Sequence, residues 1–383
     1  MNMFTYTATC LFGLEGLLGA EIDALGYRRL QTMDGRITFQ GDAAAAAVCN
    51  IHLRFAERLY LQLGQFHAAT FEELFQGTRA LSLEEWIGKN DAFPVRGHAI
   101  KSALFSVPDC QRIIKKAAAT RLEEIYGISR LPETGRKYQL DFFLFKDTAS
   151  IMIDLSGTPL HKRGYRPGTV QAPLRETLAA AVAKLARPRE NVLFCDPFCG
   201  SGTIVIEAVM QMQNIAPGLF RTFAAEAFPQ FPRALWDAAR EAARERMCET
   251  KTDFSARASD IDPAAVEIAG ECARRAGVFD KIRFCCQDAR TLRSEGVRGT
   301  IATNPPYGER LLSLQEAEQL YREIGKSWRE NLKCWQIYVL TSHEAFPRLY
   351  GRRPDKVRKL YNGMIPCHLY QFFKNPQKMG KFA

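Results

Sequence analysis

The sequence predicts an α/β protein in which a doubly wound, mostly parallel sheet forms the second part of the chain and two smaller α+β units precede it. From residue 176 onward strand and helix patterns alternate, which is typical of a parallel sheet with helices on both faces. Residues 1–157 contain shorter groups of strands and helices in a βαβ-type order, which indicates α+β units. The 383 residues also exceed one ordinary domain. We therefore expect three domains, over residues 1–65, 66–157 and 158–383.

The first two units contain helices with clear ends. Residues 13–25 place leucines at helical spacing, and Gly26 is a typical residue to follow a helix. Pro108 begins a second helical pattern that runs to residue 125, shortly before Gly127. The other helices expected here cover residues 42–50 and 74–86. The expected strands cover residues 4–9, 36–39, 59–63, 98–105, 138–145 and 150–155.

The third unit begins after a boundary, residues 156–175, that is rich in glycine, proline and basic residues and has no acidic one. Apolar runs beyond it predict strands over residues 191–195, 256–259, 282–286, 299–303 and 335–341. Helical patterns fall on residues 176–185, 201–212 and 263–276. Residues 213–255, with three prolines and a charged helical stretch, read as an insertion in this alternation.

The composition excludes several classes of protein. No apolar run approaches the roughly 20 residues of a membrane span, so we expect no membrane partner. Glu15 and Glu21 interrupt the N-terminal apolar stretch, which is unlike a signal peptide, so a cytoplasmic protein is expected. The 11 cysteines include no C-x-x-C pair. They are therefore expected to be reduced thiols, and no metal site is predicted.

The net charge of +10 is unevenly distributed, which suggests a polyanionic partner. Residues 1–160 carry a net charge of −1, whereas residues 161–383 carry +11. The helix over 108–125 also places three basic residues on one face, although a solvated face of an amphipathic helix would look the same. The candidate RNA-binding residues are Arg112, Lys115, Lys116, Lys162, Arg163, Arg166, Arg352 and Arg353.

A glycine loop follows the first strand of the predicted parallel sheet. It reads Asp196-Pro-Phe-Cys-Gly-Ser-Gly202 and leads into a helix, so its backbone can approach a ligand closely. Such loops lie at the carboxyl ends of strands, where ligands bind in doubly wound sheets. A dinucleotide site would have its third glycine where Val205 stands, and a phosphate-binding P-loop would have a lysine. Asp196 is better suited to accept hydrogen bonds from an amino group.

Two further acids follow the next strands. Asp260 ends the second sheet strand, where a carboxylate can accept hydrogen bonds from both hydroxyls of a ribose. Asp288 comes just after the third strand, where it can accept from an adenine amino group. A single aspartate at a strand end is more often a helix cap, and Asp262 before Pro263 is a candidate for that role. Three acids after three successive strands favour a ligand.

The segment Asn304-Pro305-Pro306-Tyr307 follows the fourth sheet strand. Its two prolines restrict the backbone, so carbonyl groups point outward instead of into a helix. The side-chain oxygen of Asn304 and the carbonyl of Pro305 can accept both N–H bonds of an exocyclic base amino group, and Tyr307 can stack on the base. A proline-rich loop of purely structural value is the alternative. The combination with the glycine loop and the acids, in matching order, favours base methylation.

These segments together resemble a class I RNA methyltransferase that carries an N-terminal THUMP domain. The similar segments are Asp196-Pro-Phe-Cys-Gly-Ser-Gly202, Ser259-Asp-Ile-Asp262 and Asn304-Pro-Pro-Tyr-Gly-Glu-Arg310, and also Leu160-His-Lys-Arg-Gly-Tyr-Arg166, Ala172-Pro-Leu-Arg-Glu-Thr-Leu-Ala-Ala180, Thr9-Cys-Leu-Phe-Gly-Leu-Glu-Gly16 and Phe105-Ser-Val-Pro-Asp-Cys-Gln-Arg112. The resemblance is to the branch that includes bacterial large-subunit ribosomal RNA guanine-N2 methyltransferases, and it covers essentially the whole chain. It implies a ferredoxin-like unit, a THUMP domain that binds structured RNA and a Rossmann-like catalytic domain.

The resemblance also implies a cofactor and the residues that bind it. The cofactor is S-adenosylmethionine, with the methionine portion in the glycine loop, the ribose on Asp260 and the adenine on Asp288. The implied cofactor-binding residues are Asp196, Pro197, Cys199, Gly200, Ser201, Gly202, Asp260, Ile261, Asp288, Ala289, Glu176 and Thr177. The implied catalytic residues are Asn304, Pro305, Pro306 and Tyr307.

We expect this chain to methylate the exocyclic N2 of a guanine in large-subunit ribosomal RNA. The same turn would serve guanine-N2 in transfer RNA or adenine-N6, so the motif alone leaves the base and the RNA open. A non-catalytic RNA-binding or ribosome-assembly factor with the same fold is the alternative from another class.

Overall fold

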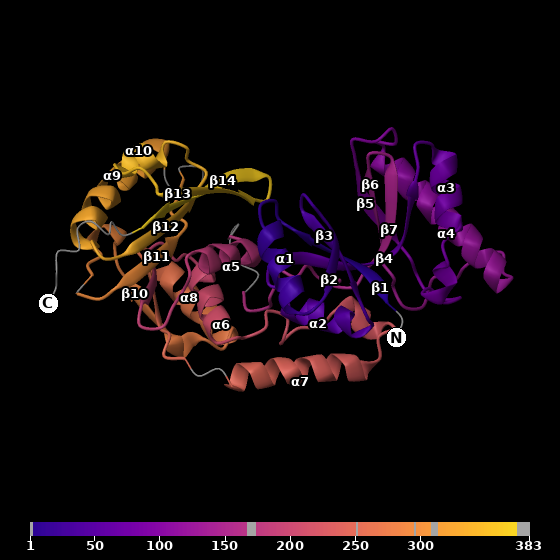
Figure 1. Cartoon of the computed structure of the whole chain (residues 1–383), viewed down its shortest axis with the longest axis horizontal. Helices are drawn as coiled ribbons and strands as arrows, with labels where there is room; N and C mark the ends of the chain where they lie inside the picture. Colours follow the sequence, from indigo (N-terminus) through magenta and orange to yellow (C-terminus); the bar gives the residue numbers. More distant parts are fainter. Residues whose placement is uncertain (1–2, 167–173, 250–251, 295, 308–312, 374–383) are drawn as a thin grey trace. The chain divides into compact units, whose positions relative to one another are not determined.

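The computed structural model describes residues 3–166, 174–249, 252–294, 296–307 and 313–373. Residues 167–173 of the predicted boundary and 308–310 of the last motif lie outside the described residues. The chain divides into two compact units, which we describe separately (Figure 1). The first comprises Met1–Thr9, Gly19–Leu160 and Thr222–Glu241, and the second comprises Cys10–Leu18, His161–Arg221 and Ala242–Ala383. No helix among the described residues is long and apolar enough to cross a membrane.

The first unit contains one seven-stranded sheet in the order β2-β3-β1-β4-β7-β6-β5. Its strands are β1 (Phe4–Cys10), β2 (Arg28–Met33), β3 (Arg36–Gly41), β4 (Ala56–His67), β5 (Val95–Ile100), β6 (Leu140–Phe145) and β7 (Thr148–Asp154). The N-terminal helices are α1 (Glu15–Ala24), α2 (Ala44–His52), α3 (Phe71–Arg79) and α4 (Val107–Tyr126). The 12-residue strand β4 joins the two halves of the sheet, because it lies between β1 and β7. The two predicted α+β units therefore share one sheet.

Three predictions for this unit were wrong in detail. Strand β2 was missed because nearly all its residues are exposed, so it has no alternation of apolar and polar positions. The strand expected over residues 98–105 is β5, three residues earlier, and it ends at Ile100. The helix expected over residues 74–86 ends at Arg79, and only a 3₁₀ turn, Leu83–Glu85, follows.

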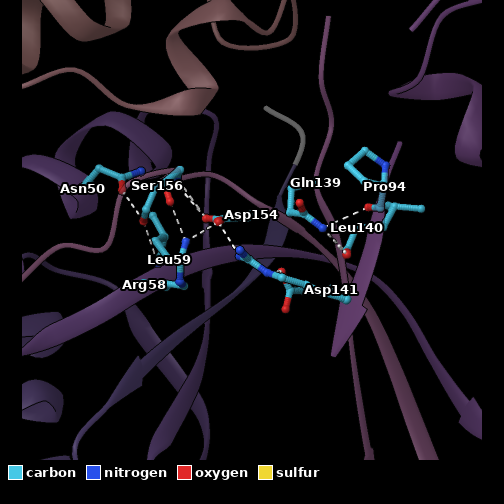
Figure 2. A network of polar contacts seen from close by, with 11 residues as sticks. Asn50, Arg58, Leu59, Pro94, Gln139, Leu140, Asp141, Asp154 and Ser156 are labelled. Atoms are coloured by element: carbon cyan, nitrogen blue, oxygen red, sulfur yellow. Dashed lines mark hydrogen bonds and ion pairs between the residues drawn. The ribbon is translucent and has the colours of Figure 1, made fainter. Parts of the chain in front are cut away.

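A partly buried polar network links β4, β7, β6 and β5 in one half of this sheet (Figure 2). The carboxylate of Asp154 accepts from Arg58 Nη1 on β4 at 2.5 Å and from Arg96 Nη2 on β5 at 2.7 Å. Arg96 Nε donates to Asp141 at 2.7 Å, and Ser156 Oγ donates to Asn50 Oδ1 at 2.8 Å. Because Asp154 is almost completely buried, these cations compensate the cost of burying its charge.

Part of the predicted insertion belongs to the first unit. Residues 222–241 lie in it, and they include the start of α7 (Arg233–Glu249). Phe228 stacks on Tyr138 with ring centroids 4.2 Å apart, and the backbone N–H of Ala224 donates to the carbonyl of Ser156. The sequence showed a break in the strand–helix alternation at this point, but not where the segment packs.

The second unit confirms the predicted doubly wound sheet. Its order is β10-β9-β8-β11-β12-β14-β13, and the five strands from β10 to β12 are parallel, while β14 is antiparallel to both of its neighbours. The strands are β8 (Leu193–Asp196), β9 (Ala256–Asp260), β10 (Ile282–Cys286), β11 (Gly299–Thr303), β12 (Gln336–Thr341), β13 (Lys356–Asn362) and β14 (Ile365–Phe372).

Helices cover both faces of this sheet (Figure 1). Helices α5 (Glu176–Leu185), α6 (Thr203–Met212) and α8 (Pro263–Arg275) lie on one face. Helices α9 (Leu314–Asn331) and α10 (Phe346–Tyr350) pack on the other face, around a core that includes Trp328 and Phe346. Asp262 caps α8 by accepting from the N–H of Ala264 at 2.9 Å, which confirms the capping role expected for it. The sheet thus presents the carboxyl ends of its parallel strands along one edge.

Candidate active site

The strand order brings the predicted site residues to one edge of the second sheet. Asp196 ends β8, Asp260 ends β9, Asp288 follows β10 by two residues and Asn304 directly follows β11. These four strands are neighbours in the order β10-β9-β8-β11 and run parallel. Their carboxyl ends therefore meet, as expected for a ligand site in a doubly wound sheet.

The glycine loop between β8 and α6 is fixed by its backbone. Gly202 caps α6 with φ = +75°, and Gly200 has φ = +50°, both in the left-handed region that glycine adopts readily. A Cβ atom on Gly202 would lie 3.1 Å from Cβ of Ala269, whereas a Cβ on Gly200 would meet no atom within 4 Å. The loop therefore packs against α8 at Gly202 and borders open space at Gly200.

Asp260 orients this loop through both carboxylate oxygens. Its Oδ2 accepts from the N–H of Gly200 at 2.9 Å, and its Oδ1 accepts from the N–H of Asp262 at 3.1 Å. A carboxylate has about four acceptor positions, so it can still accept from two hydroxyl groups. The side chain of the next residue, Ile261, is 64% exposed and offers an apolar surface beside the carboxylate.

Asp196 is the buried acid of the site. Its Oδ1 accepts from Thr303 Oγ1 at 2.5 Å and from the N–H of Phe198 at 3.2 Å. Desolvation by burial raises the pKa of Asp196 to about 7, although both hydrogen bonds oppose the shift. A nearby ammonium group would stabilise the charged form, so this carboxylate suits a cationic amine.

Asp288 differs from the other two acids because an arginine binds it. Arg290 donates to both oxygens, with Nε at 3.0 and 2.9 Å and Nη2 at 2.6 Å, and also donates to Glu323 at 2.7 Å. These hydrogen bonds lower the pKa of Asp288 below its ordinary value. The neighbouring Ala289 is buried, and its carbonyl accepts from Trp328 Nε1 at 2.9 Å. The sequence analysis missed Arg290, although it lies only two residues from the acid.

The turn after β11 is held from two sides. Tyr307 donates from its hydroxyl to Asn304 Oδ1 at 2.5 Å, so the predicted acceptor oxygen has a hydrogen bond within the chain. The carbonyl of Pro306 accepts from the hydroxyl of the buried Tyr321, on α9, at 2.6 Å. Pro305 between them is buried. Tyr321 escaped the sequence analysis because no helix was predicted over 314–331, although Ser313 and Glu316 form a capping box there.

Two residues implied by the resemblance lie at the start of α5. Glu176 and Thr177 are buried. Arg166 lies 3.7 Å from Glu176 Oε1, and its Nη2 donates to Thr203 Oγ1 and to the carbonyl of Leu174, each at 2.9 Å. Arg166 thus links the start of α5 to the first residue of α6, beside the glycine loop.

The predicted RNA-binding cations differ in their surroundings. Arg163 is buried, and its Nε lies 3.3 Å from the carboxylate of Glu207. The burial of Arg163 argues against the expected RNA contact, because a surface ligand cannot reach the guanidinium in this arrangement. The partly buried Arg166 contacts Glu176, Thr203 and the Leu174 carbonyl within the chain, as described above. Lys115 donates to Glu133 at 2.7 Å, and Arg352 donates to Asp355 at 2.9 Å and to the carbonyl of Phe373 at 2.7 Å. The exposed candidates are Arg112, Lys116, Lys162 and Arg353.

The residues at this edge fit S-adenosylmethionine. That molecule has a cationic amine, a ribose with two hydroxyls and a planar base, and the site offers a buried acid, an oriented carboxylate and an exposed apolar side chain. The open space beside Gly200 leaves room for a ligand against the loop backbone. Among the described residues, no group of three or more His, Cys, Asp or Glu side chains is arranged to hold a metal ion.

Comparisons with known families give the same three-part organisation. Residues 163–371 match the family described as RMKL-like, methyltransferase domain. Residues 5–60 match the RlmL ferredoxin-like domain, and residues 68–154 match the THUMP domain.

Individual relatives are similar over almost the whole chain. A protein of Bacillus subtilis named putative RNA methyltransferase YpsC is 42% identical over 99% of this chain and 98% of its own length. The ribosomal RNA large subunit methyltransferase K/L of Psychromonas ingrahamii is 32% identical over 98% of this chain, which spans 51% of that enzyme.

Several solved structures resemble almost the whole chain, and two of them serve as examples. SMU.472, described as a putative methyltransferase complexed with SAH, has a TM-score of 0.90 and 38% identity and covers 98% of this chain and 99% of its own. A predicted N6-adenine-specific DNA methylase of Listeria monocytogenes has a TM-score of 0.91 and 41% identity, with 98% and 97% covered.

Proposed function

The chain belongs to the RMKL-like methyltransferase family, and we propose that it transfers a methyl group from S-adenosylmethionine to the exocyclic N2 of a guanine in large-subunit ribosomal RNA. Support for RNA as the substrate comes from the match to the THUMP domain and from the names of the Bacillus and Psychromonas relatives. Support for a ribosomal target comes from the Psychromonas enzyme, of which this chain spans about half.

This proposal rests mainly on the turn Asn304–Tyr307. The turn directly follows Thr303, whose hydroxyl donates to Asp196. Bound S-adenosylmethionine supplies an electrophilic methyl group on a sulfonium. Asn304 Oδ1 and the carbonyl of Pro305 accept the two N–H bonds of the target amino group and orient its nitrogen. Tyr307 gives up its hydrogen bond to Asn304 and stacks on the base, while Tyr321 holds the Pro306 carbonyl in place.

The cofactor roles follow the geometry of the three acids. We assign the methionine amine to Asp196, the ribose hydroxyls to Asp260 and the adenine amino group to Asp288. The loop residues Pro197, Cys199, Gly200, Ser201 and Gly202 surround the methionine portion, and Ile261, Ala289, Glu176 and Thr177 complete the site. Asp288 is ionised at neutral pH and the Arg290 guanidinium lowers its pKa further, so this side chain is an acceptor there.

The RNA-binding assignment is narrower than the sequence suggested. Of the eight cations predicted from the sequence, we retain the exposed Arg112, Lys116, Lys162 and Arg353 as phosphate contacts. We also propose domain limits at residues 1–65, 66–157 and 158–383, with residues 222–241 of the third domain lying in the first compact unit.

The experiment that tests this function is nucleoside mass spectrometry of ribosomal RNA from a strain that lacks the gene. We expect N2-methylguanosine to decrease at one position and to return with the wild-type gene. Asn304→Ala should fail to restore it while binding S-adenosylmethionine normally in calorimetry, whereas Asn304→Asp, which keeps an acceptor oxygen, should restore part of it. An unchanged N2-methylguanosine content would contradict the proposal.

Adenine-N6 is the second candidate target, because the Listeria structure carries that description and the same turn can hold either amino group. In the same experiment, loss of N6-methyladenosine in place of N2-methylguanosine would favour it. If N2-methylguanosine is instead lost from transfer RNA alone, the proposed reaction is correct and the substrate is transfer RNA. A protein that binds no S-adenosylmethionine in calorimetry would instead be a non-catalytic RNA-binding factor.

A further inference from the structure

The β13–β14 hairpin extends beyond the edge of the second sheet at which the candidate active site lies. Thr341, the last residue of β12, pairs with His368, and β14 begins three residues earlier, at Ile365. Three further pairs between β13 and β14 therefore lie past the end of β12, which places the turn of the hairpin roughly 10 Å beyond it at about 3.4 Å a residue. Because β12 runs parallel to β11, this is also the edge at which Asn304 begins the proposed base-binding turn.

The turn of this hairpin presents a large apolar side chain to solvent. Met364 is 89% exposed, more than any other large hydrophobic residue that the structure describes. Gly363 before it has φ = +66°, a conformation that glycine adopts readily, so the turn is tight. A single exposed apolar residue is common on protein surfaces, and its exposure alone indicates nothing. The position of Met364 beside the active site, on a supported and basic hairpin, is what points to a function.

The hairpin is supported along its outer strand, β13. Arg358 Nη2 donates to the carbonyl of Gly13 at 3.4 Å, and the ring of Tyr361 meets that of Phe12 edge-on, with centroids 5.8 Å apart. A Cβ atom on Gly13 would lie 2.9 Å from the carbonyl oxygen of Lys359, so the two backbones are in close contact. Both segments belong to the second compact unit. The turn therefore projects from a braced element and can transmit force to a ligand.

The hairpin is also basic. Residues 356–373 contain Lys356, Arg358 and Lys359 and no aspartate or glutamate, and both lysines are exposed. An apolar side chain at the tip and cations on the adjoining strand are the combination with which proteins kink nucleic acids: the apolar side chain enters between bases while the cations contact phosphates. A protein partner would gain little from one apolar side chain and would have to compensate these charges. The hairpin is therefore suited to a nucleic acid.

The proposed reaction creates a need for such a side chain. In a guanine–cytosine pair, one N–H of the exocyclic N2 is bonded to the cytosine, whereas Asn304 and the carbonyl of Pro305 are proposed to accept both. A paired target guanine must therefore leave its partner and its stack before it can react. An apolar side chain that enters the gap replaces part of the lost stacking and opposes the return of the base.

We propose that Met364 enters the RNA helix as the target guanine leaves it, and that Lys356 and Lys359 contact the phosphates nearby. The inference rests on the proposed function, because it takes a guanine of structured RNA as the target, but it concerns a step that precedes methyl transfer. Met364 is thus a positioning residue, which acts on the RNA stack and touches neither the cofactor nor the reacting atoms. It has no task when the target base is already unpaired.

The test uses the guanine identified in the deletion-strain experiment, placed in a short synthetic stem-loop RNA either opposite cytosine or opposite an abasic site. Single-turnover methylation of the paired form should be roughly tenfold slower with Met364→Ala than with the wild-type chain, whereas the abasic form should change less than about twofold, because an unpaired base is extruded most easily. Met364→Leu keeps an apolar side chain and should stay within about threefold of wild type on both RNAs. Met3→Ala, at an exposed methionine outside the hairpin, is the matched control and should change neither rate.

A second measurement follows extrusion of the base without the methyl transfer. With 2-aminopurine at the target position, opposite uracil, fluorescence should rise when the wild-type chain binds and should rise less with Met364→Ala. Equal slowing of Met364→Ala on the two RNAs, an unchanged rate on the paired form, or a wild-type enzyme that is inactive on the paired guanine would each overturn the inference, provided that the variant binds S-adenosylmethionine normally. If the deletion strain loses a different nucleoside, the same two RNAs are built around that nucleotide, so failure of this inference is distinguishable from failure of the proposed function.

Discussion

Protonation of Asp196 should weaken S-adenosylmethionine binding as the pH falls below 7. Burial raises the pKa of this carboxyl to about 7, so in the free protein it is half protonated near neutral pH. The proposed role requires the ionised form, because only a carboxylate accepts a hydrogen bond from, and attracts, a cationic amine. Below pH 7, binding must therefore release the proton from Asp196, and the free energy of that release is lost from binding.

The size of the effect follows from the pKa of about 7. The dissociation constant should be about twice its high-pH limit at pH 7, about 11-fold above that limit at pH 6 and roughly 100-fold above it at pH 5. Isothermal titration calorimetry between pH 5 and 7.5 covers this range and stays below the ordinary α-amino pKa of ~7.7–8.0. At pH 5.5, titrations in two buffers of different ionisation enthalpy should reveal the release of about one proton per bound molecule.

Two variants separate this mechanism from a general effect of pH. Asp196→Asn should bind weakly at every pH and without a slope, because an amide does not titrate in this range. Thr303→Val removes a hydrogen bond that lowers the pKa of Asp196, so the loss of affinity should begin at a higher pH. The reasoning would be refuted by a wild-type affinity that stays flat from pH 5 to 7.5, or by a slope that survives in Asp196→Asn.

Three further predictions concern side chains or backbone around the site. Tyr321→Phe removes the hydroxyl bound to the Pro306 carbonyl, so single-turnover methylation should slow about tenfold with unchanged cofactor affinity; an unchanged rate would mean that the turn needs no such support. Arg163→Met leaves the buried Glu207 without its cation, and urea denaturation should show unfolding free energy lower by ~3–5 kcal/mol, with recovery in a Glu207→Leu double variant. Gly202→Ala forces a non-glycine residue into φ = +75°, which should cost ~1–2 kcal/mol and lower the thermal midpoint; an unshifted midpoint would contradict the strain argument.

The parallel sheet was the part of the fold that the sequence predicted best. Strands β10 and β11 begin and end at the residues expected, because they are short apolar runs bounded by loops. Edge and surface elements were harder. Strand β2 has no buried side, and β13 alternates weakly at the edge of its sheet, so neither had the period of two that indicates a strand. Helix α9 was missed, although its capping box and its amphipathic pattern could have predicted it.

The positions of the site residues were predictable, but most of their partners were not. A polar residue at the end of a parallel strand points to a site because the strand ends converge, whatever the rest of the fold. The bond between Asp196 and Thr303 joins residues 107 positions apart and depends on the register of β8 and β11. Arg163 shows a similar limit for surface predictions. It is adjacent to the exposed Lys162, and a local charge pattern does not reveal which of the two is buried.

The pairing of β8 with β11 couples the two halves of the proposed reaction. In that register Ile301 lies beside Cys195, the residue before Asp196. Two residues further along β11, the hydroxyl of Thr303 donates to the carboxylate of Asp196 at 2.5 Å. The next residue is Asn304, whose side-chain oxygen is the proposed acceptor for the target amino group. Thr303, which binds the proposed partner of the cofactor amine, and Asn304, which is proposed to orient the nucleophile, are therefore adjacent in the chain. Because both residues lie at the carboxyl end of a buried sheet, main-chain pairing would help to align the proposed nucleophile with the cofactor.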